Sequence, residues 1–142
     1  MFSAAYWYGS FASMIVSEEA AQTGSIGTLL IHREMSKLEE RTGITTTVFR
    51  SAPYKAVVNS IEPLNDKSRE VINEELDFYH KSFVSSIAEN RGLDTGYVQK
   101  QIATGKVYRP QEAIGLKMID RVGGLQEVVA KLNAKFENTG AR

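Results

Sequence analysis

Short apolar segments with the composition of β-strands alternate along this chain with segments whose apolar residues have helical spacing. This alternation limits the possible fold more than any other feature of the sequence. The strand-like segments are residues 14–16, 28–31 and 45–49, and the strongest helical patterns are residues 66–91 and 125–136. Alternating strands and helices are typical of α/β domains, in which helices cover a sheet. We therefore expect a layered α/β domain.

Capping residues, prolines and glycines set the expected ends of the helices. The expected helices cover residues 3–13, 34–41, 66–91, 94–105, 110–115 and 125–136. In the last of them, Leu125, Val129, Leu132 and Phe136 recur at helical spacing, which predicts that this side faces inward. We expect one domain over residues 1–142, ordered to about residue 136 and followed by a loose tail at 138–142.

The composition excludes several classes of partner. Lys and Arg together number 17, as do Asp and Glu, so the formal net charge is zero. A neutral chain without a basic run is a poor candidate for binding nucleic acid or an anionic membrane. The chain of 142 residues is long enough to bury a core, and 42% of its residues are hydrophobic. This composition is ordinary for a globular domain.

The absence of cysteine from the sequence excludes disulfides, thiolate nucleophiles and cysteine-based zinc sites. No histidine pair has metal-ligand spacing, so we expect neither a metal nor another cofactor. No apolar run reaches the roughly 18 residues of a membrane span. We expect a soluble, cytoplasmic chain, with membrane association only if a preceding segment carries an anchor.

Ser3 and Lys55 are the residues whose surroundings best fit nucleophilic catalysis. Ser3 begins an apolar helix, and the backbone N–H groups that follow it lie at the positive end of the helix dipole. Lys55 lies in an apolar stretch, where desolvation favours a neutral lysine that can accept a proton. The structural alternatives are that Ser3 is an ordinary N-cap and that Lys55 extends its ammonium group to water.

The two histidines offer competing bases. His32 follows the strand-like segment 28–31, so a Ser3–His32 pair is a rival to the Ser3–Lys55 pair. His80 lies on the expected long helix beside Tyr79 and Lys81, and we expect it to be partly exposed. The acidic residues are scattered over helix faces and form no recognisable carboxylate pair.

Several segments occur in an order that carries a resemblance. Ser3-Ala4-Ala5-Tyr6-Trp7 leads into Ile15-Val16, and Thr23-Gly24-Ser25-Ile26-Gly27 and Pro53-Tyr54-Lys55 follow. Near the C-terminus come Gly105-Lys106-Val107-Tyr108, Gln111-Glu112-Ala113, Gly115-Leu116, Ile119-Asp120 and Gly123-Gly124. The ordered set resembles the SppA-like (signal peptide peptidase A) serine peptidases as far as about Leu132. Its first segment is more similar to the branch of phage capsid and head-maturation proteases.

The resemblance implies a ClpP/crotonase-like α/β fold and a Ser-Lys dyad. Ser3 would be the nucleophile and Lys55 its general base, with the Ser25 hydroxyl orienting the lysine. The Ala4 N–H would supply part of the oxyanion hole. The family resemblance also implies homo-oligomeric rings or domes and extended polypeptide substrates, such as signal-peptide remnants or phage scaffold and capsid proteins. For a phage protein, the location would be the host cytoplasm or the virion.

The sequence departs from the family pattern at its start, since the family places several strands and helices before its nucleophile. Here only two residues precede Ser3, so we expect the N-terminal part of the family fold to be absent from this chain. A second hypothesis is therefore a truncated, inactive module that forms oligomers. A third is a crotonase-like acyl-CoA enzyme, but the chain has neither the upstream glycine-rich turn nor the CoA-binding surface that this activity requires.

Overall fold

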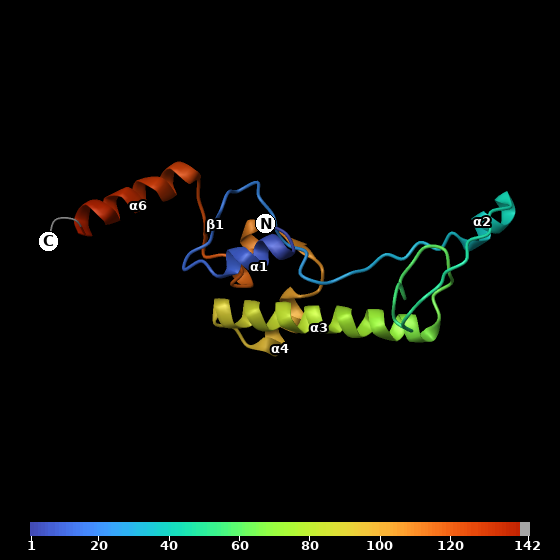
Figure 1. Ribbon diagram of the computed structural model, residues 1–142. Coiled ribbons are helices and arrows are strands. Elements are labelled where there is room, and N and C mark those ends of the chain that lie inside the picture. The colour runs from blue at the N-terminus through green and yellow to red at the C-terminus, as the bar shows by residue number, and fades with distance from the viewer. Residues whose placement is uncertain (140–142) are drawn as a thin grey trace. The chain divides into compact units, whose positions relative to one another are not determined.

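The computed structural model describes residues 1–139, with their side chains as far as residue 136, and divides the chain into two units (Figure 1). Unit 1 comprises residues 1–27 and the chain from Lys81 onward, whereas unit 2 comprises Thr28–His80. The helices are α1 (Ala4–Ser10), α2 (Ser36–Thr42), α3 (Asp66–Arg91), α4 (Thr95–Tyr97), the π-helical turn η1 (Val98–Ile102), α5 (Pro110–Gly115) and α6 (Leu125–Thr139). The strands are β1 (Val16–Ser17), β2 (Thr23–Gly24), β3 (Val107–Tyr108) and β4 (Arg121–Val122).

The predicted caps explain where the helices begin. The Asn65 side chain accepts a hydrogen bond from the Ser68 N–H at 2.8 Å, directly before α3. Asp94 accepts from the Tyr97 N–H at 2.8 Å at the start of α4. Such bonds satisfy N–H groups that have no partner within the helix. Pro110 occupies the first turn of α5, as predicted. The sequence therefore located these three helix starts correctly.

Short strands connect distant parts of unit 1. Phe2 forms a parallel bridge with Gly24, and β2 pairs in antiparallel fashion with β3. Separately, β1 pairs in parallel with β4, with Val16 opposite Arg121. The fold is thus mixed α/β, with helices and a few short strands.

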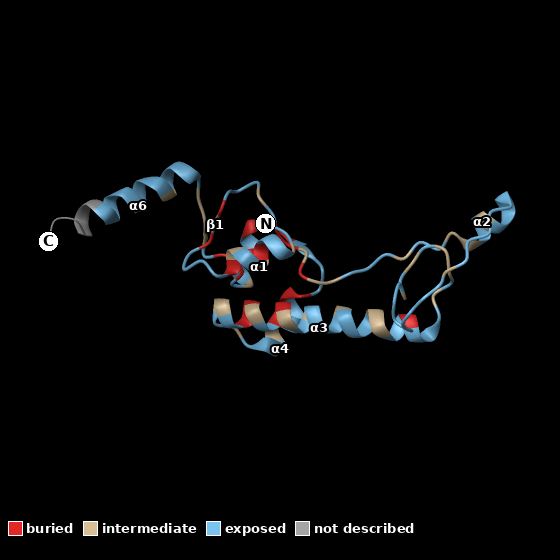
Figure 2. Cartoon of the chain, in the orientation of Figure 1, coloured by how far each residue is buried: buried red, intermediate tan, exposed pale blue. Residues whose placement is uncertain are grey.

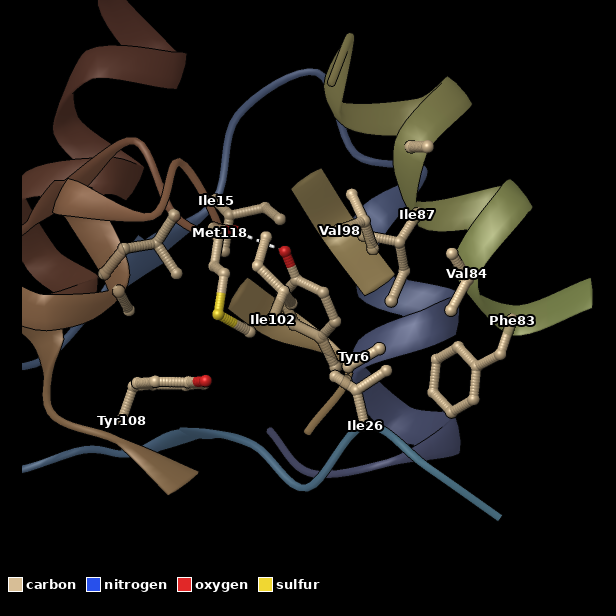
Figure 3. Packing of buried hydrophobic residues seen from close by; sticks show 14 residues of the cluster. Tyr6, Ile15, Ile26, Phe83, Val84, Ile87, Val98, Ile102, Tyr108 and Met118 are labelled. Carbon is tan, nitrogen blue, oxygen red and sulfur yellow. Dashed lines mark hydrogen bonds between the residues drawn. The ribbon is translucent and has the colours of Figure 1, made fainter. Parts of the chain in front are cut away.

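The hydrophobic core lies in unit 1, where α1, the C-terminal part of α3, η1 and α5 meet (Figure 3). Tyr6 of α1 is fully buried, and Trp7 stacks on Phe83 of α3 with ring centroids 4.6 Å apart. The fully buried side chains with the largest volumes include Tyr6, Ile26, Ile87, Ile102, Met118, Val84 and Val98. The helix that begins directly after Ser3 is therefore anchored in the hydrophobic core.

Polar contacts fix the segment after α5 against α1 and α3. The Tyr6 hydroxyl donates to the Met118 carbonyl at 2.7 Å. Asp120 accepts from the Ile15 N–H at 2.6 Å and pairs with Arg91 of α3 at 2.7 Å. The Arg91 side chain is only 8% exposed, so removal of Asp120 would leave a largely buried cation without its partner.

Unit 2 differs from the prediction because residues 28–31 and 45–49 form no strands. Leu29, Ile31 and Phe49 are 79%, 84% and 91% exposed. A β-type sequence becomes a strand only when its backbone pairs with another strand, and no strand lies within unit 2. The expected short helix does form as α2, and Gly43 ends it in the left-handed conformation with φ 75°.

The apolar residues of α6 also depart from expectation. Leu125, Val129, Leu132 and Phe136 were predicted to face inward, but they are 44–72% exposed (Figure 2). The helical pattern is correct, but this stripe has no packing surface among the described residues. Helix α6 continues to Thr139, so part of the predicted loose tail is helical, and its last three residues lie outside the described chain. No helix within residues 1–139 combines the length and apolar character that crossing a membrane requires.

Candidate functional site

Ser3 occupies a strained turn between an extended residue and a helix. Phe2 pairs with Gly24, Ser3 has φ 50° and ψ −128°, and α1 begins at Ala4. Positive φ is unfavourable for a residue with a Cβ atom, and such strain persists only where the surroundings enforce it. A serine at a sharp strand-to-helix turn has its hydroxyl exposed for nucleophilic attack in several hydrolases. The conformation of Ser3 is therefore that of a candidate nucleophile.

The N-terminus of α1 offers a free hydrogen-bond donor beside Ser3. The Ser3 hydroxyl makes no capping bond, so the alternative that Ser3 is an ordinary N-cap is not supported. The N–H groups of Ala5, Tyr6 and Trp7 donate to the carbonyls of Phe2 and Ser3. The Ala4 N–H has no acceptor among the described residues. The Ala4 N–H follows Ser3 directly, so it could donate a hydrogen bond to an oxyanion formed at Ser3.

Ser25 occupies the position next to Ser3 on the neighbouring chain segment. Because Phe2 and Gly24 form a parallel bridge, the residues that follow them are neighbours, and the Ser3 N–H donates to the Gly24 carbonyl at 2.8 Å. Ser25 also has positive φ, at 55°, and its N–H donates to the Lys106 carbonyl at 2.8 Å. The structure thus brings together three of the four predicted site residues: Ser3, Ala4 and Ser25.

Gly24 makes this approach possible. It has φ 139°, and a Cβ atom at this position would lie 2.4 Å from the Lys106 carbonyl oxygen. Only glycine accommodates both that conformation and that contact. The glycine at position 24 therefore has a physical basis, since it lets β2 lie between Phe2 and β3.

Two further features of α1 bear on its chemistry. Ala4, Trp7, Tyr8 and Phe11 line an apolar hollow on the helix surface. Ser10, the other serine of α1, is fully buried, donates to the Trp7 carbonyl at 2.6 Å and accepts from the Asn90 side chain at 2.8 Å. Because its hydroxyl is buried and hydrogen-bonded within the protein, Ser10 is not a rival nucleophile.

Lys55, the fourth predicted site residue, belongs to unit 2. It lies in the loop between α2 and α3, is exposed within its unit, and donates its backbone N–H to the Ala52 carbonyl at 3.0 Å. Its side chain forms no ion pair with any described residue. Its role as a base toward Ser3 stays a prediction.

His32 also belongs to unit 2 and has a structural role there. The ring is half-buried, and its Nε2 donates to the Asn59 carbonyl at 2.6 Å. A neutral imidazole that donates through Nε2 keeps only Nδ1 as an acceptor. The geometry thus gives His32 a task that needs no catalytic partner.

Sequence reasoning missed the polar residues that surround the Lys55 loop. Arg50 and Asn59 each bond to Glu62, and each also donates to a backbone carbonyl of this loop. The Asn59 side chain accepts from the Ile61 and Glu62 N–H groups, which forms an Asx turn. The Asn-Ser dipeptide before Pro63 is a signal from which this turn could have been predicted. Among the described residues, no three His, Asp or Glu side chains are grouped as metal ligands would be.

A strained serine between an extended residue and a helix, with a free N–H beside it, is typical of hydrolases that place their nucleophilic serine at such a turn. Residues 1–138 match the model of Peptidase family S49, and the chain belongs to this family. The chain is 29% identical to a Methanocaldococcus jannaschii protein named as a protease, over 92% of this chain and 42% of that protein. It is 26% identical to an Enterococcus faecium protein named as a signal peptide peptidase SppA, over 98% and 40%.

A phage protein is also among the relatives. The chain is 29% identical to the capsid assembly protease C of Escherichia phage lambda, over 84% of this chain and 27% of that protein. The resemblance to SppA-like peptidases and to their phage branch is thus confirmed. The chain spans about two fifths of the length of the M. jannaschii and E. faecium relatives.

Proposed function

We propose that this protein is a serine endopeptidase of SppA type that hydrolyses peptide bonds with a Ser3–Lys55 dyad. Membership of Peptidase family S49 supports peptidase activity in general. The observation that carries the assignment of the nucleophile is the strained backbone of Ser3, at φ 50° and ψ −128°, together with a hydroxyl that caps no helix. Strain of this kind is concentrated at functional sites.

The proposed mechanism has two stages. In the first, Ser3 Oγ attacks the scissile carbonyl carbon while neutral Lys55 Nζ takes the hydroxyl proton. The tetrahedral intermediate places its negative oxygen on the Ala4 N–H, and the C–N bond breaks as Lys55 returns the proton to the leaving amine. In the second stage, Lys55 takes a proton from water as the water oxygen attacks the acyl-serine ester. The ester C–O bond then breaks, and Lys55 returns the proton to Ser3 Oγ, which releases the carboxylic acid and free Ser3.

The Ser25 hydroxyl has a supporting part in this proposal, which is to hold the neutral lysine amine toward Ser3. The positive φ of Ser25 and its place beside Ser3 in the parallel register favour that role. The proposal includes a ClpP/crotonase-like fold and a homo-oligomeric ring or dome. Substrates are extended polypeptides, such as signal-peptide remnants or phage scaffold and capsid proteins, and the site of action is the cytoplasm.

Covalent labelling of the protein with a fluorophosphonate, read by intact mass and peptide mapping, tests this function. We expect the label on Ser3 and an increase in labelling rate as the pH rises, because only the deprotonated lysine accepts a proton. Lys55→Ala should slow the labelling by about 10²–10⁴-fold, the usual contribution of a general base. His32→Ala should still be labelled, and it should lose far less of the labelling rate than Lys55→Ala. A folded wild-type protein whose Ser3 stays unlabelled would contradict the proposal.

A second candidate function is an inactive module that forms oligomers. The exposed apolar side of α6, with Leu125 and Phe136 at 65% and 72% exposure, favours a role in assembly. Light scattering together with the labelling assay separates the two functions. Oligomers without a reactive serine would support the assembly module, whereas oligomers labelled at Ser3 would support the peptidase.

A further inference from the structure

We propose that Arg50, Asn59 and Glu62 form a clamp that positions Lys55 for catalysis. This inference rests on the proposed function, because it assumes that Lys55 is the base. The three residues act through the backbone of the loop, so they are positioning residues. All the contacts that support the clamp lie within unit 2.

The first arm of the clamp is the Arg50 side chain. Its Nε donates to the Lys55 carbonyl at 2.8 Å, and its terminal nitrogens pair with the Glu62 carboxylate. The planar guanidinium presents several donors in a fixed geometry, so one side chain can hold two groups at once. Arg50 therefore ties the backbone of Lys55 to the chain that leads into α3.

The second arm is Asn59, which holds the residue after the lysine. Its Nδ2 donates to the Ala56 carbonyl at 2.9 Å and to Glu62 at 2.7 Å. Ala56 has φ 56°, a left-handed conformation that is unfavourable for a residue with a Cβ atom. The hydrogen bond to its carbonyl offsets part of that cost and helps to keep the turn in this shape.

Two neighbours support the clamp. His32 Nε2 donates to the Asn59 carbonyl at 2.6 Å, which holds Asn59 from the other side. Tyr54 lies under Lys67 of α3, with the Lys67 Nζ 4.3 Å from the ring centroid. Contacts thus hold the Tyr54 ring, the Lys55 carbonyl and the Ala56 carbonyl. The Lys55 side chain itself remains exposed.

The clamp also engages the acidic group of this loop. Glu62 pairs with Arg50 and accepts from Asn59, and Lys55 makes no ion pair with the described residues. An ion pair would favour the charged lysine, which cannot act as a base. The Glu62 carboxylate is thus bound by Arg50 and Asn59 rather than by the Lys55 amine, and the clamp fixes the backbone of the lysine.

The test compares rates of Ser3 labelling in the full chain. Arg50→Ala should lower the maximal labelling rate by about 10–10²-fold and leave the half-saturating reagent concentration unchanged, because a misplaced catalytic group slows the chemical step. Arg50→Lys should label at an intermediate rate, because lysine keeps the charge but lacks the several donors of the planar guanidinium. Free guanidinium added at millimolar concentration should restore part of the Arg50→Ala rate. Arg41→Ala, at an exposed arginine of α2 in the same unit, is the matched control and should label like the wild type.

A measurement that does not depend on activity completes the test. Hydrogen exchange read by mass spectrometry should become faster in peptides that cover residues 51–63 of Arg50→Ala, but not in peptides of unit 1. Asn59→Ala should increase exchange in the same peptides. If exchange and labelling in both variants match the Arg41→Ala control, the clamp does not exist.

The clamp and the proposed function fail in different ways. If Lys55→Ala labels as fast as the wild type, Lys55 is not the base and the proposed dyad is wrong, whatever Arg50 does. If Lys55→Ala stops labelling while Arg50→Ala labels normally, the dyad stands and the clamp is wrong. A shift of the pH dependence in Arg50→Ala with an unchanged maximal rate would also overturn it, because Arg50 would then act through its charge rather than by position.

Discussion

The two units of the chain differ in the interactions that stabilise each of them internally. The cluster of 14 buried hydrophobic residues lies entirely in unit 1, around the helix that follows Ser3. In unit 2, Ser68 is the only buried residue among those that the structure describes, and ten large apolar side chains, from Leu29 to Tyr79, are exposed. The proposed nucleophile thus depends on dense packing, whereas the loop of the proposed base depends on polar contacts.

This difference predicts how each half of the site can be damaged. Packing fails when volume is removed, because the surrounding side chains collapse only partly into a cavity. A polar loop fails when one donor or acceptor is lost, and the rest of the unit can remain as it was. Substitutions in unit 1 should therefore act mainly on stability, and substitutions around Lys55 mainly on rate.

The largest effect on stability is expected at Ile87, which is fully buried on α3. Ile87→Ala should lower the free energy of unfolding by about 2–5 kcal/mol, the usual range for such a truncation in a core. Phe49→Ala, at a side chain 91% exposed in unit 2, should change it by less than about 0.5 kcal/mol. Urea unfolding followed by circular dichroism measures both. Equal losses in the two variants would mean that unit 2 has a core of its own.

A smaller effect is expected at Gly24. Gly24→Ala should cost about 1–3 kcal/mol, because alanine at φ 139° is strained and its Cβ would meet the Lys106 carbonyl at 2.4 Å. Labelling of Ser3 should slow as well, since Gly24 holds the Ser3 N–H. Gly27→Ala is the control, with no atom within 4 Å of the added Cβ. Unchanged thermal stability and labelling in Gly24→Ala would show that the turn is looser than described.

The smallest effect depends on pH. Burial raises the pKa of Asp120, but hydrogen bonds from Arg91 and the Ile15 N–H outweigh it, so the pKa lies below its usual value. The resulting stabilisation is present above the unfolded value of about 4 and is lost as the pH falls through the lower folded value. The wild type should therefore be more stable than Asp120→Asn at neutral pH, and melting temperatures should converge in acid. A difference that is constant with pH would contradict this.

The starts of several helices could be predicted from local patterns. Asn65 and Asp94 cap their helices, and Pro110 begins another, because each signal acts within a few residues. The strands expected at 28–31 and 45–49 did not form, since strand pairing depends on a partner that local sequence cannot specify. The prediction that the apolar side of α6 faces inward was wrong for the same reason. A helical pattern indicates an apolar stripe but not the surface that covers it.

Part of the site was also accessible from the sequence. Ser3, Ala4 and Ser25 were identified by resemblance, and the parallel bridge of Phe2 with Gly24 places them together. The backbone strain at Ser3 has no sequence signal, because φ is set by the segments that pack around it. The contacts of Arg50 with Lys55 and Glu62 depend on a loop fold rather than on a motif, so they became visible only in the structure.

The buried hydroxyl of Tyr6 places a ceiling on the working conditions of the proposed enzyme. A lysine base gains activity in alkali, but burial raises the pKa of Tyr6 to about 12, above the ordinary tyrosine value of 10.0. The neutral phenol that donates to Met118 thus stabilises the fold fully below about pH 10, and this contribution is lost as the pH rises through about 12. Ionised phenolate absorbs in the near ultraviolet, so the titration of Tyr6 would report when the core begins to open. The highest pH at which the proposed enzyme works would then be set by the ionisation of Tyr6 in its core.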